Sequence, residues 1–175
     1  MKKIGLVVNP IAGMGGKVGL KGSDGADTIK KARELGATQE SPLKAKRALA
    51  VIAHKKDEFT LLTLPGELGE DEAKAVGITP EVLPLERKET AEDTLRGVQL
   101  LYDAGIDALL FAGGDGTARN VAEVLEEKIP VIGIPAGVKI HSAVYATSPE
   151  NAGKVLLHFL EEEDINTITA DVMDI

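Results

Sequence analysis

Three glycines, an acid and a threonine stand together in one short segment, Gly113-Gly114-Asp115-Gly116-Thr117. Glycine has access to backbone angles that are closed to other residues, and it lets the oxygens of a phosphate approach the main chain. A helix that begins after such a turn adds N–H groups and the positive end of its dipole. Thr117 is predicted to cap this helix with its hydroxyl or to turn the hydroxyl toward a phosphate. The segment therefore predicts a site for the phosphate groups of a nucleotide.

Asp115 is the residue of this turn that points to a reaction. A carboxylate beside bound phosphates costs electrostatic energy unless it has a function. It can accept the proton of an attacking hydroxyl group or bind Mg²⁺, and both are roles of acids in phosphoryl transfer. The alternative is a tight strand-to-helix turn whose acid interacts with the helix dipole. Because three glycines surround one acid after an apolar segment, we favour phosphoryl transfer.

A second group of candidate ligand-binding residues follows the first apolar segment, residues 3–8. Asn9 stands directly after it, and Gly13, Gly15 and Gly16 come next in a glycine-rich stretch. The Asn9 amide can bind a phosphate or a nucleotide hydroxyl, and the glycines offer further backbone N–H groups. The alternative is an Asn-Pro turn that only ends the strand. We favour a binding role.

A third candidate segment, residues 135–142, follows the apolar segment 131–134. In this loop Gly137 permits a close approach of the backbone, and Lys139 offers a positive charge to a phosphate. His141 is a candidate proton carrier, but a lone histidine is more often a hydrogen-bonded structural residue. We therefore include Lys139 and leave His141 out of the predicted site.

Two familiar nucleotide-binding fingerprints do not fit this chain. The dinucleotide fingerprint needs a further glycine three residues after Gly116, where Arg119 stands. The phosphate-loop signature needs Ser or Thr after Gly16-Lys17, where Val18 stands, and a glycine in place of Ile11. The glycine turn at residues 113–117 is therefore not a dinucleotide fingerprint, and residues 11–18 are not a phosphate loop.

Apolar segments and helical patterns alternate along the whole chain. We predict strands over 3–8, 59–64, 81–85, 107–112 and 131–134, and helices over 26–35, 42–56, 69–76, 90–102, 118–128 and 149–163. This order is typical of β-α-β units, so we expect a Rossmann-like three-layer α/β domain with a mainly parallel sheet over residues 1–164. Ligands of such folds bind at the carboxyl ends of the strands, where Asn9, the glycine turn and Lys139 all stand.

Composition limits the classes of function. The 175 residues carry a net charge of −8 and no cysteine. Disulfides, thiolate metal sites and cysteine nucleophiles are excluded, and nucleic acids and anionic membranes are not expected as partners. No segment approaches a membrane span or a signal peptide, so we expect a cytoplasmic location. The acidic runs at 70–72 and 161–164 are expected to be solvated surface. A small phosphorylated ligand remains compatible with all of this.

The motifs resemble those of a known family. Residues 113–117 resemble the hallmark of NAD kinases and of the superfamily that includes diacylglycerol kinases, sphingosine kinases and phosphofructokinases. Residues 9–16 are similar to the first loop of the same group. Residues 21–25 and 134–143 resemble a narrower branch, the prokaryotic ATP-NAD kinase-like proteins related to the acetoin-catabolism protein AcoX. The likeness extends over nearly the whole chain.

The resemblance implies an N-terminal α/β domain, then a β-rich C-terminal domain that residues 165–175 would begin; an edge strand of the first domain is the alternative for this tail. It also implies a kinase in which Asp115 is the catalytic acid-base residue and Gly113, Gly114, Gly116 and Thr117 hold phosphates. ATP or another phosphoryl donor with Mg²⁺ would be the cofactors, and a nucleotide such as NAD the partner. A homo-oligomer is compatible with this class. The Asn-Glu pair with which NAD kinases hold the dinucleotide has no equivalent here, so the acceptor stays open. A nucleotide-sensing module without phosphoryl transfer, or an assembly domain, are the alternatives.

Overall fold

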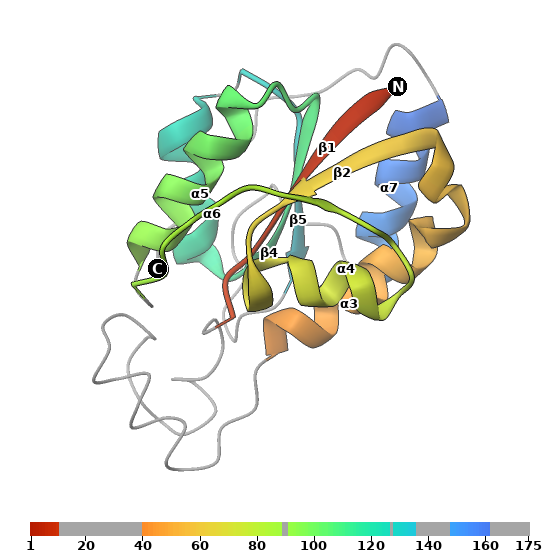
Figure 1. Cartoon of the computed structure of the whole chain (residues 1–175), viewed down its shortest axis with the longest axis horizontal. Coiled ribbons are helices and arrows are strands. Elements are labelled where there is room, and N and C mark those ends of the chain that lie inside the picture. Colours follow the sequence, from red (N-terminus) through yellow and green to blue (C-terminus); the bar gives the residue numbers. More distant parts are fainter. Residues whose placement is uncertain (11–39, 89–90, 127, 136–147, 162–175) are drawn as a thin grey trace.

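The computed structural model of the chain describes residues 1–10, 40–88, 91–126, 128–135 and 148–161 (Figure 1). Several sequence predictions therefore lie outside the described residues. They are the helix over 26–35, the binding residues Gly13, Gly15, Gly16 and Lys139, and the tail over 165–175.

The centre of the molecule is a five-stranded sheet with the order β3-β2-β1-β4-β5. Every pairing between neighbouring strands is parallel. The strands are β1 (Lys2–Val8), β2 (Phe59–Thr63), β3 (Glu81–Val82), β4 (Ala108–Gly113) and β5 (Val131–Pro135). The parallel sheet confirms the predicted fold class. The third strand is shorter than predicted, because the ladder to β2 ends at Val82 and does not extend to residue 85.

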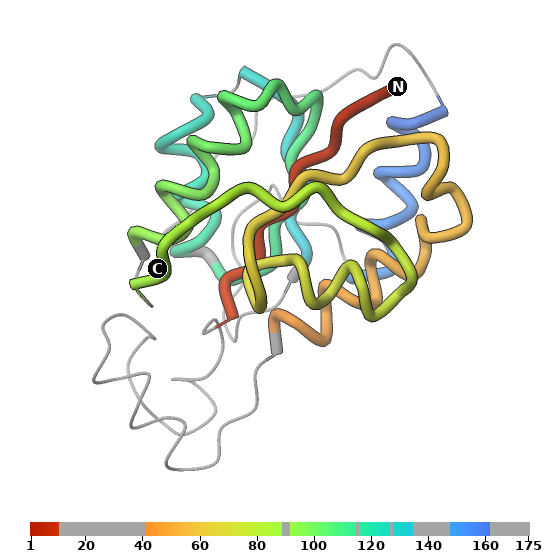
Figure 2. Tube along the Cα trace, viewed as in Figure 1, coloured from red at the N-terminus to blue at the C-terminus, as the bar shows by residue number. Residues whose placement is uncertain are grey.

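Helices cover both faces of this sheet (Figures 1 and 2). One layer contains α3 and α7, which pack on each other, and the short helix α4 beside α3; the other layer contains α5 and α6. The helices are α3 (Glu40–Ile52), α4 (Glu70–Ala75), α5 (Ala91–Asp103), α6 (Asp115–Leu125) and α7 (Pro149–Glu161), with the 3-10 turns η1 (Ala53–Glu58) and η2 (Gly66–Leu68). The predicted helix over 42–56 is thus an α-helix that ends at Ile52 and a 3-10 segment with a non-helical residue at Lys55.

Two apolar cores lie on the two faces of the sheet, because successive side chains of a strand point to opposite faces. In β1, Ile4 and Leu6 are buried among residues of α3 and α7, whereas Val7 is buried among residues of α5 and α6. The same alternation places Leu110 of β4 on the first face and Phe111 on the second. Burial on both faces explains why these strands are continuous apolar runs without a polar alternation.

The strand order places a topological switch point between β1 and β4. From β1 the chain proceeds to β2 and β3 on one side, and from β4 it proceeds to β5 on the other side. Connections that leave two neighbouring strands in opposite directions open a crevice at the carboxyl ends of these strands, and this is where ligands of such sheets bind. Asn9 follows β1 and Gly114 follows β4, so both lie at this point.

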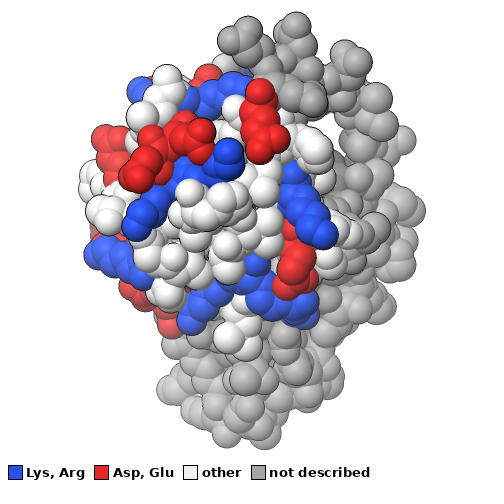
Figure 3. Space-filling model, turned by 90° about the vertical axis from the view of Figure 1, so that its right-hand side faces the viewer, with Lys and Arg blue, Asp and Glu red and all other residues white. Residues whose placement is uncertain are grey.

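The charged surface corrects one prediction. Figure 3 shows acidic and basic side chains interspersed over the face opposite α5 and α6. The acidic run at 70–72 was expected to belong to such solvated surface, but Glu72 is only 1% exposed. It lies on the side of α4 that also buries Ala73. The position of Glu72 on the helix, and not its charge, therefore determines its burial. Among the described helices, none combines the length and apolar character needed to cross a bilayer.

Candidate functional site

The site is built where β1 and β4 end side by side. The two strands pair in parallel up to Val8 and Ala112. The backbone N–H of Asn9 then donates to the carbonyl oxygen of Ala112 at 2.9 Å. This bond continues the ladder one residue beyond β1. The register of the two strands therefore places Asn9 beside Gly113, which is the last residue of β4.

The helix after the glycine turn begins earlier than predicted. It starts at Asp115 and not at residue 118, and Gly114 is its N-cap with extended backbone angles of φ −99° and ψ −165°. The first intrahelical bond runs from the N–H of Ala118 to the carbonyl oxygen of Gly114 at 3.0 Å. The N–H groups of residues 115–117 therefore have no acceptor within the helix. The N-cap Gly114 has no side chain to cap this end, so these groups and the helix dipole form a position for an anion.

Thr117 does not cap the helix, which corrects the first of its two predicted roles. It lies within the first turn of α6, and its side chain is only 3% exposed. Its hydroxyl Oγ1 accepts a hydrogen bond of 3.0 Å from the side-chain amide Nδ2 of Asn9. Two residues that are 108 positions apart in the chain are thus joined across the switch point.

One of the two functions predicted for the glycines of the turn is wrong. None of the three adopts a positive φ angle, so unusual backbone angles are not the reason for glycine here. A Cβ atom on Gly113 would lie 2.3 Å from Oγ1 of Thr117, which means that the threonine packs directly on the glycine. A Cβ atom on Gly116 would meet no atom within 4 Å, and Gly116 is exposed. Gly113 is required by the fold, whereas Gly116 leaves an open surface at the start of α6.

The structure therefore brings together part of the predicted site. Asn9, Gly113, Gly114, Gly116 and Thr117 converge on the end of β4 and the start of α6. Asp115 is the first residue of α6, and the structure describes its backbone but not its side chain. Within the described part of the chain, no group of three or more His, Asp or Glu side chains is arranged to hold a metal ion.

The burial of Glu72 in α4 was not predicted from the sequence. Its Oε2 has no hydrogen-bond partner among the described residues, and neither does the buried hydroxyl of Ser41 in α3, the helix that packs on α4. Burial raises the pKa of Glu72 to about 8, because a carboxylate loses its hydration there. Glu72 stands beside the buried Ala73 and four positions before Val76, which packs on the same core, and this helical spacing was the signal for its burial.

Comparison with known proteins agrees with this geometry. The family model described as the ATP-NAD kinase N-terminal domain matches residues 4–165. This range contains β1 from Ile4 onward, the glycine turn and all the other described elements. No curated protein matches the chain. Over almost its entire length the chain therefore belongs to the family of ATP-NAD kinase N-terminal domains, which supports a role of the nucleotide-kinase type.

Proposed function

We propose that the chain binds ATP at the N-terminus of α6 and takes part in the transfer of its γ-phosphoryl group to a hydroxyl group of a small nucleotide. The observation that carries this proposal is the start of α6 at the topological switch point, where three N–H groups without an intrahelical acceptor follow a glycine N-cap. Membership of the ATP-NAD kinase N-terminal domain family supports the same chemistry.

The glycine turn is suited to phosphate groups for three reasons. The helix dipole and the N–H groups of residues 115–117 attract negative charge. The exposed Gly116 has no side chain and no neighbour within 4 Å of its potential Cβ, so an anion can reach the main chain there. A hydrogen bond from the side-chain amide of Asn9 fixes the hydroxyl group of Thr117. The sequence prediction that Gly113, Gly114, Gly116 and Thr117 form the phosphate site is thus consistent with their arrangement.

In the proposed reaction, Asp115 is the general base. The acceptor hydroxyl oxygen forms a bond to the γ-phosphorus, the bond from this phosphorus to the bridging oxygen breaks, and ADP leaves. Asp115 takes the proton of the hydroxyl group, as acids in phosphoryl-transfer sites do. Its place at the first residue of α6, within the anion position, supports this role. Charge neutralisation and alignment of the reacting groups supply most of the rate in this chemistry.

Mg²⁺ fits this site as a companion of the nucleotide. It prefers oxygen ligands and is commonly bound by one or two carboxylates together with substrate phosphates. The turn contains one carboxylate residue, Asp115, and no dedicated cluster of acids is present in the described residues. Phosphate oxygens of the nucleotide would supply the main ligands of the ion, with Asp115 kept as the general base, and the ion would neutralise phosphate charge when bound.

Gly116→Ala tests the place of the phosphates. The methyl group meets no protein atom, and alanine favours a helix, so folding should be unaffected. A phosphate bound against this backbone would be displaced, and we expect ATP affinity to fall at least tenfold in calorimetric titration with Mg²⁺. Glu123→Ala, an exposed change farther along α6, is the control. Unchanged affinity of Gly116→Ala would place the nucleotide elsewhere.

Asp115→Asn tests the reaction separately from binding. The expected result is a loss of turnover of about 10²-fold or more, because general bases contribute on this order, while ATP still binds. The assay measures ADP formation with NAD and other nucleotides as acceptors. ATP binding without any product in the unmodified protein would instead support a nucleotide-sensing module.

A further inference from the structure

The hydrogen bond between Asn9 and Thr117 carries an inference that rests on the proposed function. We propose that Asn9 is a positioning residue, which sets the phosphate-binding turn of α6 through Thr117 and does not itself contact the nucleotide. Asn9 was predicted to bind the ligand with its side-chain amide. In the structure, however, Nδ2 of this amide donates to Oγ1 of Thr117 at 3.0 Å.

Three segments meet at this bond. Asn9 is fixed to the end of the sheet by the bond from its N–H to the carbonyl oxygen of Ala112 at 2.9 Å. Thr117 belongs to the first turn of α6, and its Oγ1 lies 2.3 Å from the point where Gly113 would carry a Cβ. The end of β1, the end of β4 and the start of α6 therefore meet at one buried hydroxyl group.

This arrangement matters because the chain leaves β1 and β4 in opposite directions at the switch point. The backbone bond from Asn9 to Ala112 joins the ends of the two strands, and the side-chain bond from Asn9 to Thr117 extends this connection to the start of α6. Thr117 is 3% exposed and lies in the same helical turn as Asp115 and the exposed Gly116. Any shift of Thr117 moves the N–H groups of the first turn of α6. Asn9 therefore affects nucleotide binding indirectly, through the position of Thr117.

A double-mutant cycle separates positioning from direct contact. The variants are Asn9→Ala, Thr117→Val and their combination, with Thr117→Ser as the conservative variant. Thr117→Val keeps the shape of the side chain but removes the hydroxyl. Thr60→Val is the matched control, because Thr60 pairs with Lys3 near the starts of β1 and β2, at the opposite end of the strands from the site. Affinity for ATP with Mg²⁺ is measured by calorimetry, and hydrogen exchange of the amides of residues 115–118 is measured without ligand.

The positioning role predicts that each single variant binds ATP about fivefold to tenfold more weakly, as expected for one lost hydrogen bond. The combined variant should be no weaker than either single one, Thr117→Ser should recover most of the affinity, and Thr60→Val should bind as the unmodified protein does. The first-turn amides should exchange faster in Asn9→Ala and Thr117→Val. Additive losses, or a loss in Asn9→Ala alone, would overturn the proposal in favour of direct contact by Asn9.

The exchange measurement also distinguishes this proposal from the proposed function. If the unmodified protein binds no ATP, the proposed function fails, while faster exchange in both variants still shows that Asn9 positions the turn. If ATP binds but exchange of residues 115–118 is unchanged in both variants, the proposed function stands and the positioning role of Asn9 is wrong.

Discussion

Glu72 shows at the scale of one residue how a fold can set a proton affinity. The side chain is 1% exposed, and its Oε2 has no hydrogen-bond partner among the described residues. Loss of hydration is the main cause that raises the pKa of Glu72 to about 8, and the negative charges of Asp71 and Glu67 raise it further. A hydrogen bond from its own backbone N–H and the positive charge of Lys46 in α3 lower it. The acid is therefore protonated in the folded protein at neutral pH.

This protonation predicts a pH-dependent stability. The ordinary carboxyl pKa of 4.5 describes the unfolded chain, and the folded value is raised. Between pH 4.5 and about 8 only the folded state keeps the proton, so stability falls as pH rises, by at most about 1.4 kcal/mol per pH unit. Glu72→Gln should remove this slope and be more stable than the unmodified protein at pH 8. Urea unfolding at several pH values measures it.

Glu70 in the same helix is the matched control. It accepts from the N–H of Gly66 at 3.0 Å and from Lys74 at 2.7 Å, and these bonds lower the pKa of Glu70. Its contribution is present above the unfolded pKa and is lost as the solution becomes more acid. Glu70→Gln should leave the slope between pH 5 and 8 as it is. An equal slope in Glu72→Gln and the unmodified protein would show that Glu72 is ionised in the fold.

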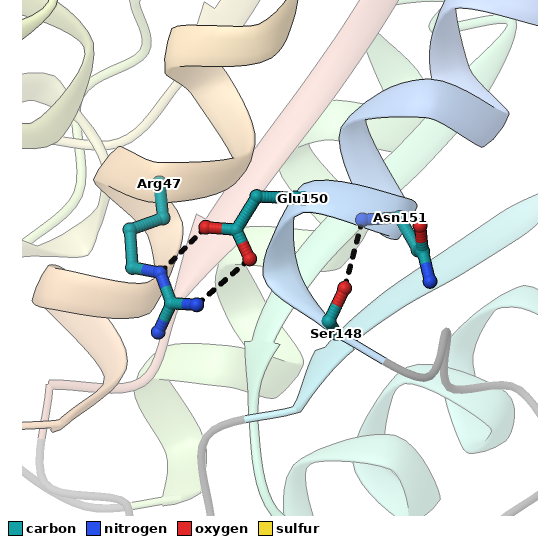
Figure 4. Close-up of polar contacts among 4 residues, drawn as sticks. All are labelled: Arg47, Ser148, Glu150 and Asn151. Atoms are coloured by element: carbon teal, nitrogen blue, oxygen red, sulfur yellow. Dashed lines mark hydrogen bonds and ion pairs between the residues drawn. The ribbon is translucent and has the colours of Figure 1, made fainter.

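At the scale of elements, the packing of α3 on α7 depends on a glycine. A Cβ atom on Gly153 would lie 2.6 Å from the carbonyl oxygen of Ala48 and 2.7 Å from Cβ of Val51. The two helices also share the ion pair Arg47–Glu150, whose two bonds measure 2.6 and 2.7 Å (Figure 4). Both of these side chains are more than 40% exposed, so water screens their attraction.

This contrast predicts unequal effects of two changes at one interface. Gly153→Ala should destabilise the fold by about 1–3 kcal/mol, because the helices must separate to admit a methyl group. Arg47→Ala should cost less than about 1 kcal/mol, as exposed ion pairs do. Chemical unfolding of both variants at the same pH compares them. A larger effect of Arg47→Ala would mean that charge and not close packing joins α3 and α7.

The start of α7 offers a separate test of a single cap. The hydroxyl of Ser148 accepts from the backbone N–H of Asn151 at 3.1 Å (Figure 4). The carbonyl oxygen of Ser148 also accepts from the N–H of Ala152 at 3.1 Å. Ser148→Ala should therefore cost about 1 kcal/mol, while Ser148→Asp should keep the cap. Equal stability of the alanine variant and the unmodified protein would show that water replaces the serine.

At the scale of the whole molecule, the sheet order predicts where the fold opens first. β1 and β4 lie inside the sheet with both faces buried, whereas β3 is an edge strand of two residues. Amides of β1 and β4 should exchange with solvent only through global unfolding, and those of β3 and α4 through local opening. Residue-resolved hydrogen exchange measures this order. Equal protection of β3 and β1 would contradict it.

Much of this protein follows from the sequence by itself. The apolar runs at 3–8, 107–112 and 131–134 predicted strands, and their alternation with helical patterns predicted a parallel sheet. The glycine turn and the family likeness were visible as well, because these features are contained in a few neighbouring residues. Local pattern was enough wherever the physical cause was itself local.

Only the tertiary structure decided the strand order, and with it the site. Nothing near Asn9 in the sequence indicates that Thr117 lies 3.0 Å away, since the bond depends on the pairing of β1 with β4. The start of α6 at Asp115, the packing of Thr117 on Gly113 and the burial of Glu72 were likewise missed or misjudged. Each depends on contacts between residues that are distant in the chain or that lie on a helix face whose neighbours only the fold provides.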